Sequence, residues 1–378
     1  MVPNKVAEIL ISILRSELTG TEEVNLSNIC LEELLKVYQL SKTHNVYSMC
    51  GDYLLRHGIE DEDIYQDLVL SQLVVEMEED LLNRAMGVLE KAGFVCVPLK
   101  GAVIRNYYPK PWMRLSGDID ILVKESDWEN AKRLLCESLH LGAGRVESEL
   151  VSEQGIIIDL GKSILDRNHR DGKGSNLADI WEYVIENASG TKTLRDDMQY
   201  VYSLEHMARH FDNGGCGINH VMDLWVLNHL VMKNDAINKA RNALLIEKKD
   251  KDLEENFNQI AEKWFSSSYT SNTNGIERLI IEGGAQGTRE NKLSMNRGRY
   301  GTLMYKLKKM FVPYSYLCIL FPSLTGKRWL TPIYEVFRWI YHLRKGRFGI
   351  VLREFKAVDS IPDDEMRSIS TSLKNTNI

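Results

Sequence analysis

The stretch from Val95 to Val123 constrains the fold of this chain more than any other, because it places two carboxylates at the start of a buried strand. It reads VCVPLKGAVIRNYYPKPWMRLSGDIDILV. A short apolar run ends at Lys100-Gly101, where a helix is predicted to begin, and a second apolar run directly follows Asp118 and Asp120. Successive side chains of a strand alternate between its two faces, so both carboxylates are expected to point the same way.

Two carboxylates held this close repel each other unless a cation lies between them. Oxygen ligands of this kind suit Mg²⁺, which usually takes one or two carboxylates together with substrate phosphates. Another acidic residue, Asp159, ends the β-branched run 156–158, which is predicted to be a central strand. A carboxylate at that place is costly to bury without a charge partner, and its alternative role is to cap the end of the strand.

This arrangement resembles the nucleotidyltransferase superfamily related to DNA polymerase beta, in which a strand leads into a glycine-started helix and the next strand carries the D-x-D pair. It is most similar to an uncharacterised bacterial nucleotidyltransferase family. The matching residues are Leu99-Lys100-Gly101, Arg114 and Asp118-Ile119-Asp120-Ile121-Leu122-Val123. The resemblance implies an α+β fold, with a small mixed β-sheet nucleotidyltransferase core flanked by N-terminal and C-terminal helical regions.

The same resemblance implies roles for particular side chains. Asp118, Asp120 and Asp159 are expected to be catalytic and to bind Mg²⁺ or Mn²⁺, the third carboxylate coming from an adjacent strand. Lys100 or Arg114 is expected to hold phosphate oxygens. Gly101 would let backbone N–H groups approach the phosphates, and Ser116 is a further candidate at the same place.

The segment from Tyr200 to Leu230 continues the resemblance through its H-x-x-x-H, G-G-x-G-I and D-L patterns. His206 and His210 lie four residues apart on a predicted helix and share one face. No third ligand lies at an obvious spacing, so a structural or substrate-facing role is favoured over a zinc site. Asp223 is expected to orient a basic neighbour.

Two departures from the family pattern bear on activity. Relatives usually carry a histidine shortly after the third acidic position, where this chain has Leu160-Gly161-Lys162. Relatives also tend to have Arg where Asn219 stands, so one cation near the site is missing here. Both departures support a competing interpretation, in which the chain is a catalytically inactive nucleotide-binding or partner-binding protein on the same fold.

The pattern of apolar residues divides the chain into four regions. These are an N-terminal helical region (1–92), the nucleotidyltransferase core (93–165), a helical domain (166–300) and a basic, aromatic C-terminal helical region with a polar tail (301–378). A long helix is predicted from Asp63 to Lys91, with the acidic stretch 76–80 on its solvated face. Residues 178–188 are predicted to form a short helix. The GKGS sequence at 172–175 lacks phosphate-loop spacing and is interpreted as a surface turn.

Charge and composition exclude several classes. The net charge of −6 gives no general attraction to nucleic acid, and no apolar run approaches the length of a membrane span. Six scattered cysteines without a C-x-x-C pair indicate a reducing cytoplasm. Residues 298–356 carry 12 Lys and Arg against 2 Asp and Glu, a local charge of +10, so the remainder carries −16. The favoured interpretation is a helical pair that packs on the acidic rest of the protein. The alternative is that this region binds an anionic partner, a membrane surface or nucleic acid.

The function implied by the resemblance is metal-dependent transfer of a nucleoside monophosphate from an NTP, ATP being the simplest, with release of pyrophosphate. The partners are then a nucleotide and an unidentified acceptor, which could be a small molecule, sugar, peptide or protein. Haloacid-dehalogenase phosphatases and metal-dependent glycosyltransferases also use D-x-D. They place the apolar strand before the motif, whereas here it follows.

Overall fold

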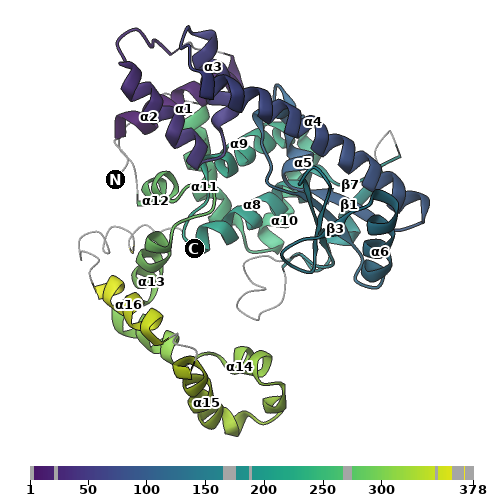
Figure 1. The fold of residues 1–378 in the computed structure, drawn as a ribbon, viewed down its shortest axis with the longest axis vertical. Helices are drawn as coiled ribbons and strands as arrows, with labels where there is room; N and C mark the ends of the chain where they lie inside the picture. Colours follow the sequence, from purple (N-terminus) through teal and green to yellow (C-terminus); the bar gives the residue numbers. More distant parts are fainter. Residues whose placement is uncertain are drawn as a thin grey trace.

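The computed structural model describes residues 4–20, 24–164, 176–186, 190–266, 275–344, 348–359 and 370. The GKGS sequence at 172–175, interpreted above as a surface turn, lies outside these residues. Helices cover both faces of one small sheet, and the last described helices form an arm that extends from this body (Figure 1).

Five strands form a mixed sheet in the order β1-β2-β5-β4-β3. The strands are β1 (Cys96–Leu99), β2 (Ile119–Val123), β3 (Gly142–Ala143), β4 (Glu149–Val151) and β5 (Ile157–Gly161). The β2–β5 pair is parallel, and the other neighbouring pairs are antiparallel. Since a parallel pair needs a crossover connection, the helix α6 (Trp128–Leu139) lies between these two strands in sequence. The parallel register pairs Asp120 with Asp159, which is the feature of the sheet that most concerns function.

One face of the sheet packs against α4 (Glu62–Lys91) and α6. Alternate residues of β2, which are Ile119, Ile121 and Val123, share an apolar core with these two helices. The indole of Trp128 donates a hydrogen bond to the Leu160 carbonyl at 2.6 Å, which fixes α6 on the sheet. The opposite face, including Leu122, joins a second and larger core. Asp118 and Asp120 therefore face that larger helical body, as the alternation along β2 requires.

The predicted boundaries of α4 are nearly those observed. Asp61 caps the helix by accepting a hydrogen bond from the Ile64 N–H at 3.0 Å, and Gly93 follows the C-terminus with a φ of 82°, in the left-handed region. The prediction that its acidic stretch is solvated is wrong for Glu78. That carboxylate is buried in an ion pair with Arg105, because the side of α4 that carries it faces the protein interior.

Two groups of helices form the larger core. The first group is α1 (Asn4–Thr19), α2 (Leu31–Thr43) and α3 (Tyr47–Arg56), and the second is α8 (Asp196–Asp212), α9 (Ile218–Met232), α10 (Asp235–Glu247) and α11 (Lys251–Phe265). Their buried side chains form one continuous cluster, so the two ends of this body fold together despite their separation in sequence. The predicted α+β class, with helical regions on both sides of a small mixed sheet, is confirmed.

Residues 180–194 contain the clearest error in the predicted secondary structure. A 3₁₀ turn (Ile180–Tyr183) leads into a hairpin of β6 (Val184–Glu186) and β7 (Lys192–Leu194), where a short helix was predicted. Its Val, Ile and Thr residues favour strands, and the hairpin lets β7 pack beside β1.

The C-terminal helices are α12 (Gly275–Gly283), α13 (Arg289–Met310), α14 (Tyr314–Leu320), α15 (Thr331–Arg344) and α16 (Phe348–Asp359). Figure 1 shows the last three held away from the sheet, with α16 beside α13 and α14 beside α15. In the described part of the chain, α16 thus packs on α13 and α14 on α15, and Arg299 of α13 forms an ion pair with Asp212 of α8. Leu303 and Trp329 remain 73% and 77% exposed. Among the described residues, no helix has both the length and the apolar character to cross a membrane.

Candidate active site

Three carboxylates converge on the face of the sheet that meets the helical body. Asp120 and Asp159 are direct neighbours in the parallel register of β2 and β5, and Asp118 precedes Asp120 by two residues on the same face. Carboxylate oxygens of all three lie within 4.8 Å of one another. Asp120 is buried and the other two are half-buried. The structure thus brings together the acidic triad (Asp118, Asp120 and Asp159) that the sequence singled out.

The electrostatics of the acidic triad show how unfavourable this crowding is without a cation. Burial, helped by the charges of Asp118 and Asp159, raises the pKa of Asp120 to about 6 against the opposing effect of Lys100. Burial also raises the pKa of Asp118, and the charge of Asp159 acts in the same direction. A positive charge among these oxygens would relieve both effects.

Lys100 supplies one such charge. Its ammonium group donates a hydrogen bond to Oδ1 of Asp120. Burial disfavours the charged lysine, but the neighbouring Tyr202 and Asp120 outweigh burial and raise the pKa of Lys100 above its usual range. The residue is therefore a permanent cation at the edge of the triad.

The backbone around Lys100 makes a tight turn out of β1. Lys100 itself has a φ of 54°, in the left-handed region, and the helix that follows, α5 (Gly101–Ile104), is only four residues long. A Cβ atom at Gly101 would lie 2.5 Å from Oγ of Ser116, so only glycine allows this close approach. Ser116 in turn donates a hydrogen bond to the Asp118 carbonyl at 2.8 Å. Gly101 and Ser116 therefore lie against each other beside the acidic triad.

Arg114 is committed to the protein itself. Its Nε and Nη2 atoms donate to the two carboxylate oxygens of Asp223 at 2.7 and 2.8 Å, and Nη1 donates to the Leu115 carbonyl. Tyr108 adds a hydroxyl donor to Asp223 at 2.8 Å. Asp223 thus has the basic neighbour that was expected of it. The buried pair ties the loop before β2 to α9 and leaves no guanidinium nitrogen of Arg114 without a protein acceptor.

A cavity of about 870 Å³ opens over the acidic triad. Lys100, Gly101, Arg114 and Ser116 line it from the side of the sheet, so all the predicted site residues border one space. Residues of α8, α9 and the glycine-rich segment 283–288 line the opposite side. Ligand pockets commonly have volumes of roughly 300–1,000 Å³, so the cavity is large enough for a nucleotide.

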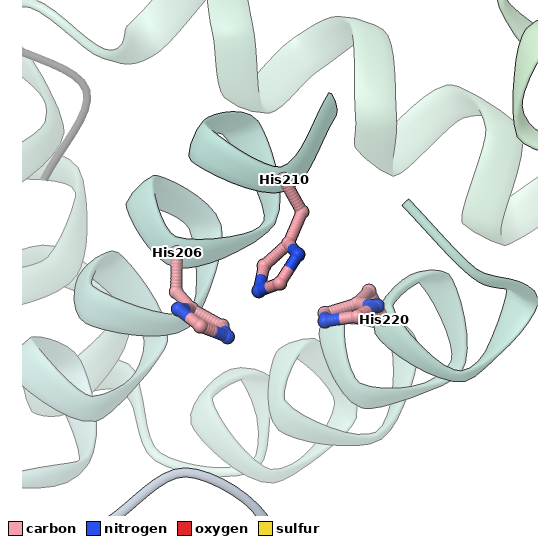
Figure 2. A group of neighbouring side chains, drawn as sticks. All are labelled: His206, His210 and His220. Atoms are coloured by element: carbon pink, nitrogen blue, oxygen red, sulfur yellow. The ribbon is translucent and has the colours of Figure 1, made fainter. Parts of the chain in front are cut away.

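Three histidines form part of that opposite side, and Figure 2 shows one ring nitrogen of each directed into the space between them. His206 and His210 come from successive turns of α8, whereas His220 comes from the first turns of α9. Ligand nitrogens of the three lie within 4.8 Å of one another. We call these residues the histidine cluster. His220 is the third member that sequence reasoning did not find, because nothing in its spacing from His210 indicates proximity.

Burial keeps the histidine cluster uncharged. It lowers the pKa of His206 and His220 well below the ordinary value for histidine, and it lowers the pKa of His210 to about 4. The positive charges of Lys100 and Arg209 act in the same direction on His206 and His210. Three neutral imidazoles therefore face one another near neutral pH.

A glycine turn places the histidine cluster. Gly214 and Gly215, between α8 and α9, have φ angles of 119° and 140°. A Cβ atom on Gly214 would lie 2.3 Å from the Thr288 carbonyl oxygen, and one on Gly215 would lie 3.1 Å from Cα of Gly283. Backbone-to-backbone packing against segment 283–288 thus folds α9 back beside α8 and brings His220 to His210.

The two departures from the family pattern have clear structural positions. Lys162, in the segment that replaces the family histidine, places its ammonium group 4.8 Å from the centre of the Trp128 ring. Asn219 is buried and lines the cavity, and its Oδ1 has no hydrogen-bond partner among the described residues. In place of the missing histidine and arginine, the imidazoles that line this cavity come from α8 and α9, and Arg209 supplies a guanidinium. Among the described residues Arg209 contacts His206 and has no carboxylate partner.

A family model described as an uncharacterised nucleotidyltransferase matches residues 32–255, which is more than half of the chain. The matched range contains the acidic triad, Lys100 and the histidine cluster, and it ends before the glycine-rich segment 283–288. No curated protein and no solved structure matches the chain.

Proposed function

The chain belongs to the uncharacterised nucleotidyltransferase family, and on that premise we propose that it transfers a nucleoside monophosphate from an NTP to an acceptor. The observation that carries this proposal is the convergence of three carboxylates and one lysine on a cavity large enough for a nucleotide. The simplest donor is ATP, and the simplest acceptor group is a hydroxyl.

The acidic triad fits Mg²⁺ or Mn²⁺. All of its donors are carboxylate oxygens, which are the ligands that these hard cations prefer, and their mutual repulsion favours a cation between them. When bound there, the ion would supply charge neutralisation for the triphosphate and its leaving group.

The protein groups contribute position and charge. Lys100 has two further N–H donors besides the one on Asp120, and these would hold phosphate oxygens in the cavity. Gly101 lines the cavity, and its missing side chain leaves room for the Ser116 hydroxyl, which also borders the cavity. The ion pair of Arg114 with Asp223 fixes the loop before β2, which carries Ser116, against α9. Positioning and electrostatic stabilisation are the main catalytic contributions in phosphoryl chemistry.

The proposed transfer needs no reactant other than the NTP and the acceptor. Asp159, half-buried at the cavity edge, takes the proton from the acceptor hydroxyl. The hydroxyl oxygen forms a bond to the α-phosphorus, and the bond from that phosphorus to the oxygen bridging to the β-phosphate breaks. The electron pair of that bond leaves on pyrophosphate, and the nucleoside monophosphate stays on the acceptor.

The test is pyrophosphate release from each of the four NTPs in the presence of Mg²⁺ and a panel of hydroxyl acceptors. We expect release with the wild-type protein and none above background with Asp118→Ala/Asp120→Ala. Circular dichroism on both proteins checks that the double variant is folded.

The inactive-protein interpretation makes the opposite forecast. Its support is the absence of a histidine after Asp159 and the presence of Asn219 in place of an arginine. Tight NTP binding without turnover, equal in the wild type and the double variant, would reject the transferase proposal and favour a nucleotide-binding protein.

A further inference from the structure

The histidine cluster has the composition of a metal site that differs in kind from the acidic triad. Its three donors are imidazole nitrogens, and one nitrogen of each ring points into a shared space (Figure 2). Imidazole suits Zn²⁺ and neighbouring transition ions, whereas carboxylate oxygens suit Mg²⁺ and Mn²⁺. The two groups therefore select different cations although they line the same cavity.

The spacing of the rings is compatible with coordination. The centre of the His210 ring lies 4.5 Å from the centre of the His206 ring and 4.9 Å from the centre of the His220 ring. Three nitrogens bound to one tetrahedral zinc ion at about 2.0–2.1 Å lie about 3.3 Å from one another. The ligand atoms already lie within 4.8 Å, so side-chain rotations alone can close the set around an ion.

Two further observations favour a ligand over a packed apolar contact. Nδ1 of His220 is buried and has no hydrogen-bond partner among the described residues. Another histidine, His44, is buried outside the cluster and shows how the nitrogens of a purely structural imidazole are satisfied in this protein. Its Nδ1 accepts from the Ile218 N–H at 3.2 Å and its Nε2 lies 3.1 Å from the Ile281 carbonyl, so both nitrogens are satisfied.

Arg209 shows how the cluster behaves before an ion binds. Its Nη2 lies 3.2 Å from Nδ1 of His206, and because arginine can only donate, that nitrogen accepts and the ring proton lies on Nε2. Binding an ion through Nε2 would move this proton to Nδ1 and displace the guanidinium. Arg209 is half-exposed at the cavity edge and has room to move. It therefore competes with a metal, both as a donor and as a charge.

We propose that His206, His210 and His220 bind a divalent transition ion of the Zn²⁺ class, with the remaining coordination position open to the cavity. Three protein ligands and one exchangeable position is the arrangement of zinc sites that contact substrate, whereas structural sites are closed by four protein ligands. The site stands on its own geometry and does not depend on the proposed transfer reaction.

Cobalt is the probe, because Co²⁺ bound by imidazole nitrogens at low coordination number absorbs visible light. The full-length protein is stripped with a chelator, dialysed and titrated with Co²⁺ in the presence of excess Mg²⁺. We expect one Co²⁺ per chain with a visible absorption band, and the same band in Asp118→Asn/Asp120→Asn. Loss of the band in that double variant would place the ion on the acidic triad and overturn the proposal.

Single variants identify the ligands. His210→Gln and His220→Gln are each expected to weaken Co²⁺ binding by at least about 100-fold, more than the 10–100-fold that loss of an outer-shell partner costs. The matched control is His229→Gln on the same helix, α9, where the imidazole packs on Trp225 with ring centres 4.0 Å apart. Binding that is equal in all three variants would reject the site.

Arg209→Met gives a change in the opposite direction. The guanidinium both hydrogen-bonds to His206 and repels a cation. Its removal is therefore expected to tighten Co²⁺ binding by about 10-fold, the size of change that residues contacting a metal ligand typically cause. Weaker binding in this variant would contradict the proposed geometry.

Absorption at the zinc X-ray edge covers the case in which the histidine variants do not fold. The wild-type protein loaded with one Zn²⁺ per chain is expected to show three imidazole ligands and one light-atom ligand. A shell of oxygen atoms with fewer than three imidazoles would overturn the assignment without any variant. Pyrophosphate release is measured separately, so failure of the transferase proposal and failure of this site give different results.

Discussion

The acidic triad and the histidine cluster face each other across one cavity but are built in different ways. The triad stands on two neighbouring strands, where backbone register fixes Asp120 beside Asp159. The cluster stands on two helices, and a turn of glycines packed on segment 283–288 fixes His220 beside His210. Donors on neighbouring strands are placed by the alternation of side chains along each strand and by the register between the strands, whereas donors on separate helices depend on contacts made elsewhere in the fold.

Two buried contacts hold these regions in relation to each other. Arg114, in the loop before β2, pairs with Asp223 of α9, which is one turn beyond His220. His44, just after α2, bridges the start of α9 and the Ile281 carbonyl. Changes in the triad, the cluster and these two bridges therefore separate local chemistry from the architecture that aligns it.

The largest expected effect comes from Asp118→Asn. Turnover should fall by roughly 10²–10³-fold, the scale seen when one electrostatic contact to the reacting group is lost. Because the folded-state pKa of Asp118 is raised, the fold prefers an uncharged group there above that pKa, so the metal-free variant should melt at a higher temperature than the wild type.

His220→Gln is the paired control for Asp118→Asn, measured by thermal unfolding with and without Mg²⁺. Stabilisation by Mg²⁺ should be lost in the aspartate variant and retained in the histidine variant. If both variants lose it equally, the two regions do not select different ions.

Breaking the ion pair between Arg114 and Asp223, which joins the two regions, should have a nearly equal effect, in this case on the free energy of unfolding. Asp223→Leu leaves the buried Arg114 guanidinium without its carboxylate, which typically destabilises a protein by about 3–5 kcal/mol. Urea unfolding measures the loss. Arg114→Met/Asp223→Leu removes both charges and should recover most of it, and a double variant as unstable as the single one would contradict this account.

His44→Gln tests the satisfied histidine. Burial lowers the pKa of His44 to about 4, so between about pH 6.5 and pH 4 the unfolded chain binds a proton at this residue that the folded protein does not. The contribution of uncharged His44 to the free energy of unfolding is therefore fully present above about pH 6.5 and is lost as the pH falls from there towards about 4. From about pH 7.5 to about pH 5 this loss amounts to about 2 kcal/mol.

The measurement is the free energy of unfolding in urea at both pH values. The wild-type protein should lose about 2 kcal/mol more than His44→Gln over this interval, since glutamine has no proton to gain. Equal losses in the two proteins would show that His44 is protonated in the fold or contributes nothing to the pH dependence.

The smallest expected effect concerns the contact between Gly101 and Ser116. A methyl group at position 101 meets the Ser116 hydroxyl at 2.5 Å, so Gly101→Ala should cost about 1 kcal/mol of stability, at the low end for overpacking. The apparent KM for the NTP should also rise. Gly101→Ala/Ser116→Ala removes the clashing oxygen and should restore part of both, whereas an unchanged KM in Gly101→Ala would separate this turn from nucleotide binding.

Much of the sheet could be predicted from sequence because the signals are local, whereas the expectation that Asp159 joins Asp118 and Asp120 came from the family resemblance. The alternation around Asp118 and Asp120 requires both carboxylates on one face, and the apolar run before Asp159 indicates a central strand. Glu78 could not be placed in this way. An acidic residue in an acidic helical stretch looks solvated until the position of Arg105 is known, and that position depends on how α4 packs.

The sequence by itself determined the α+β class, the two strands that carry the triad and the pairing of His206 with His210 on one helical face. Only the tertiary structure decided that His220 completes the cluster, that Arg114 is held by Asp223 and that the C-terminal helices pack on one another. The physical reason is the range of the interactions. Side-chain periodicity acts over a few residues, whereas these contacts join segments that are brought together when the whole body folds.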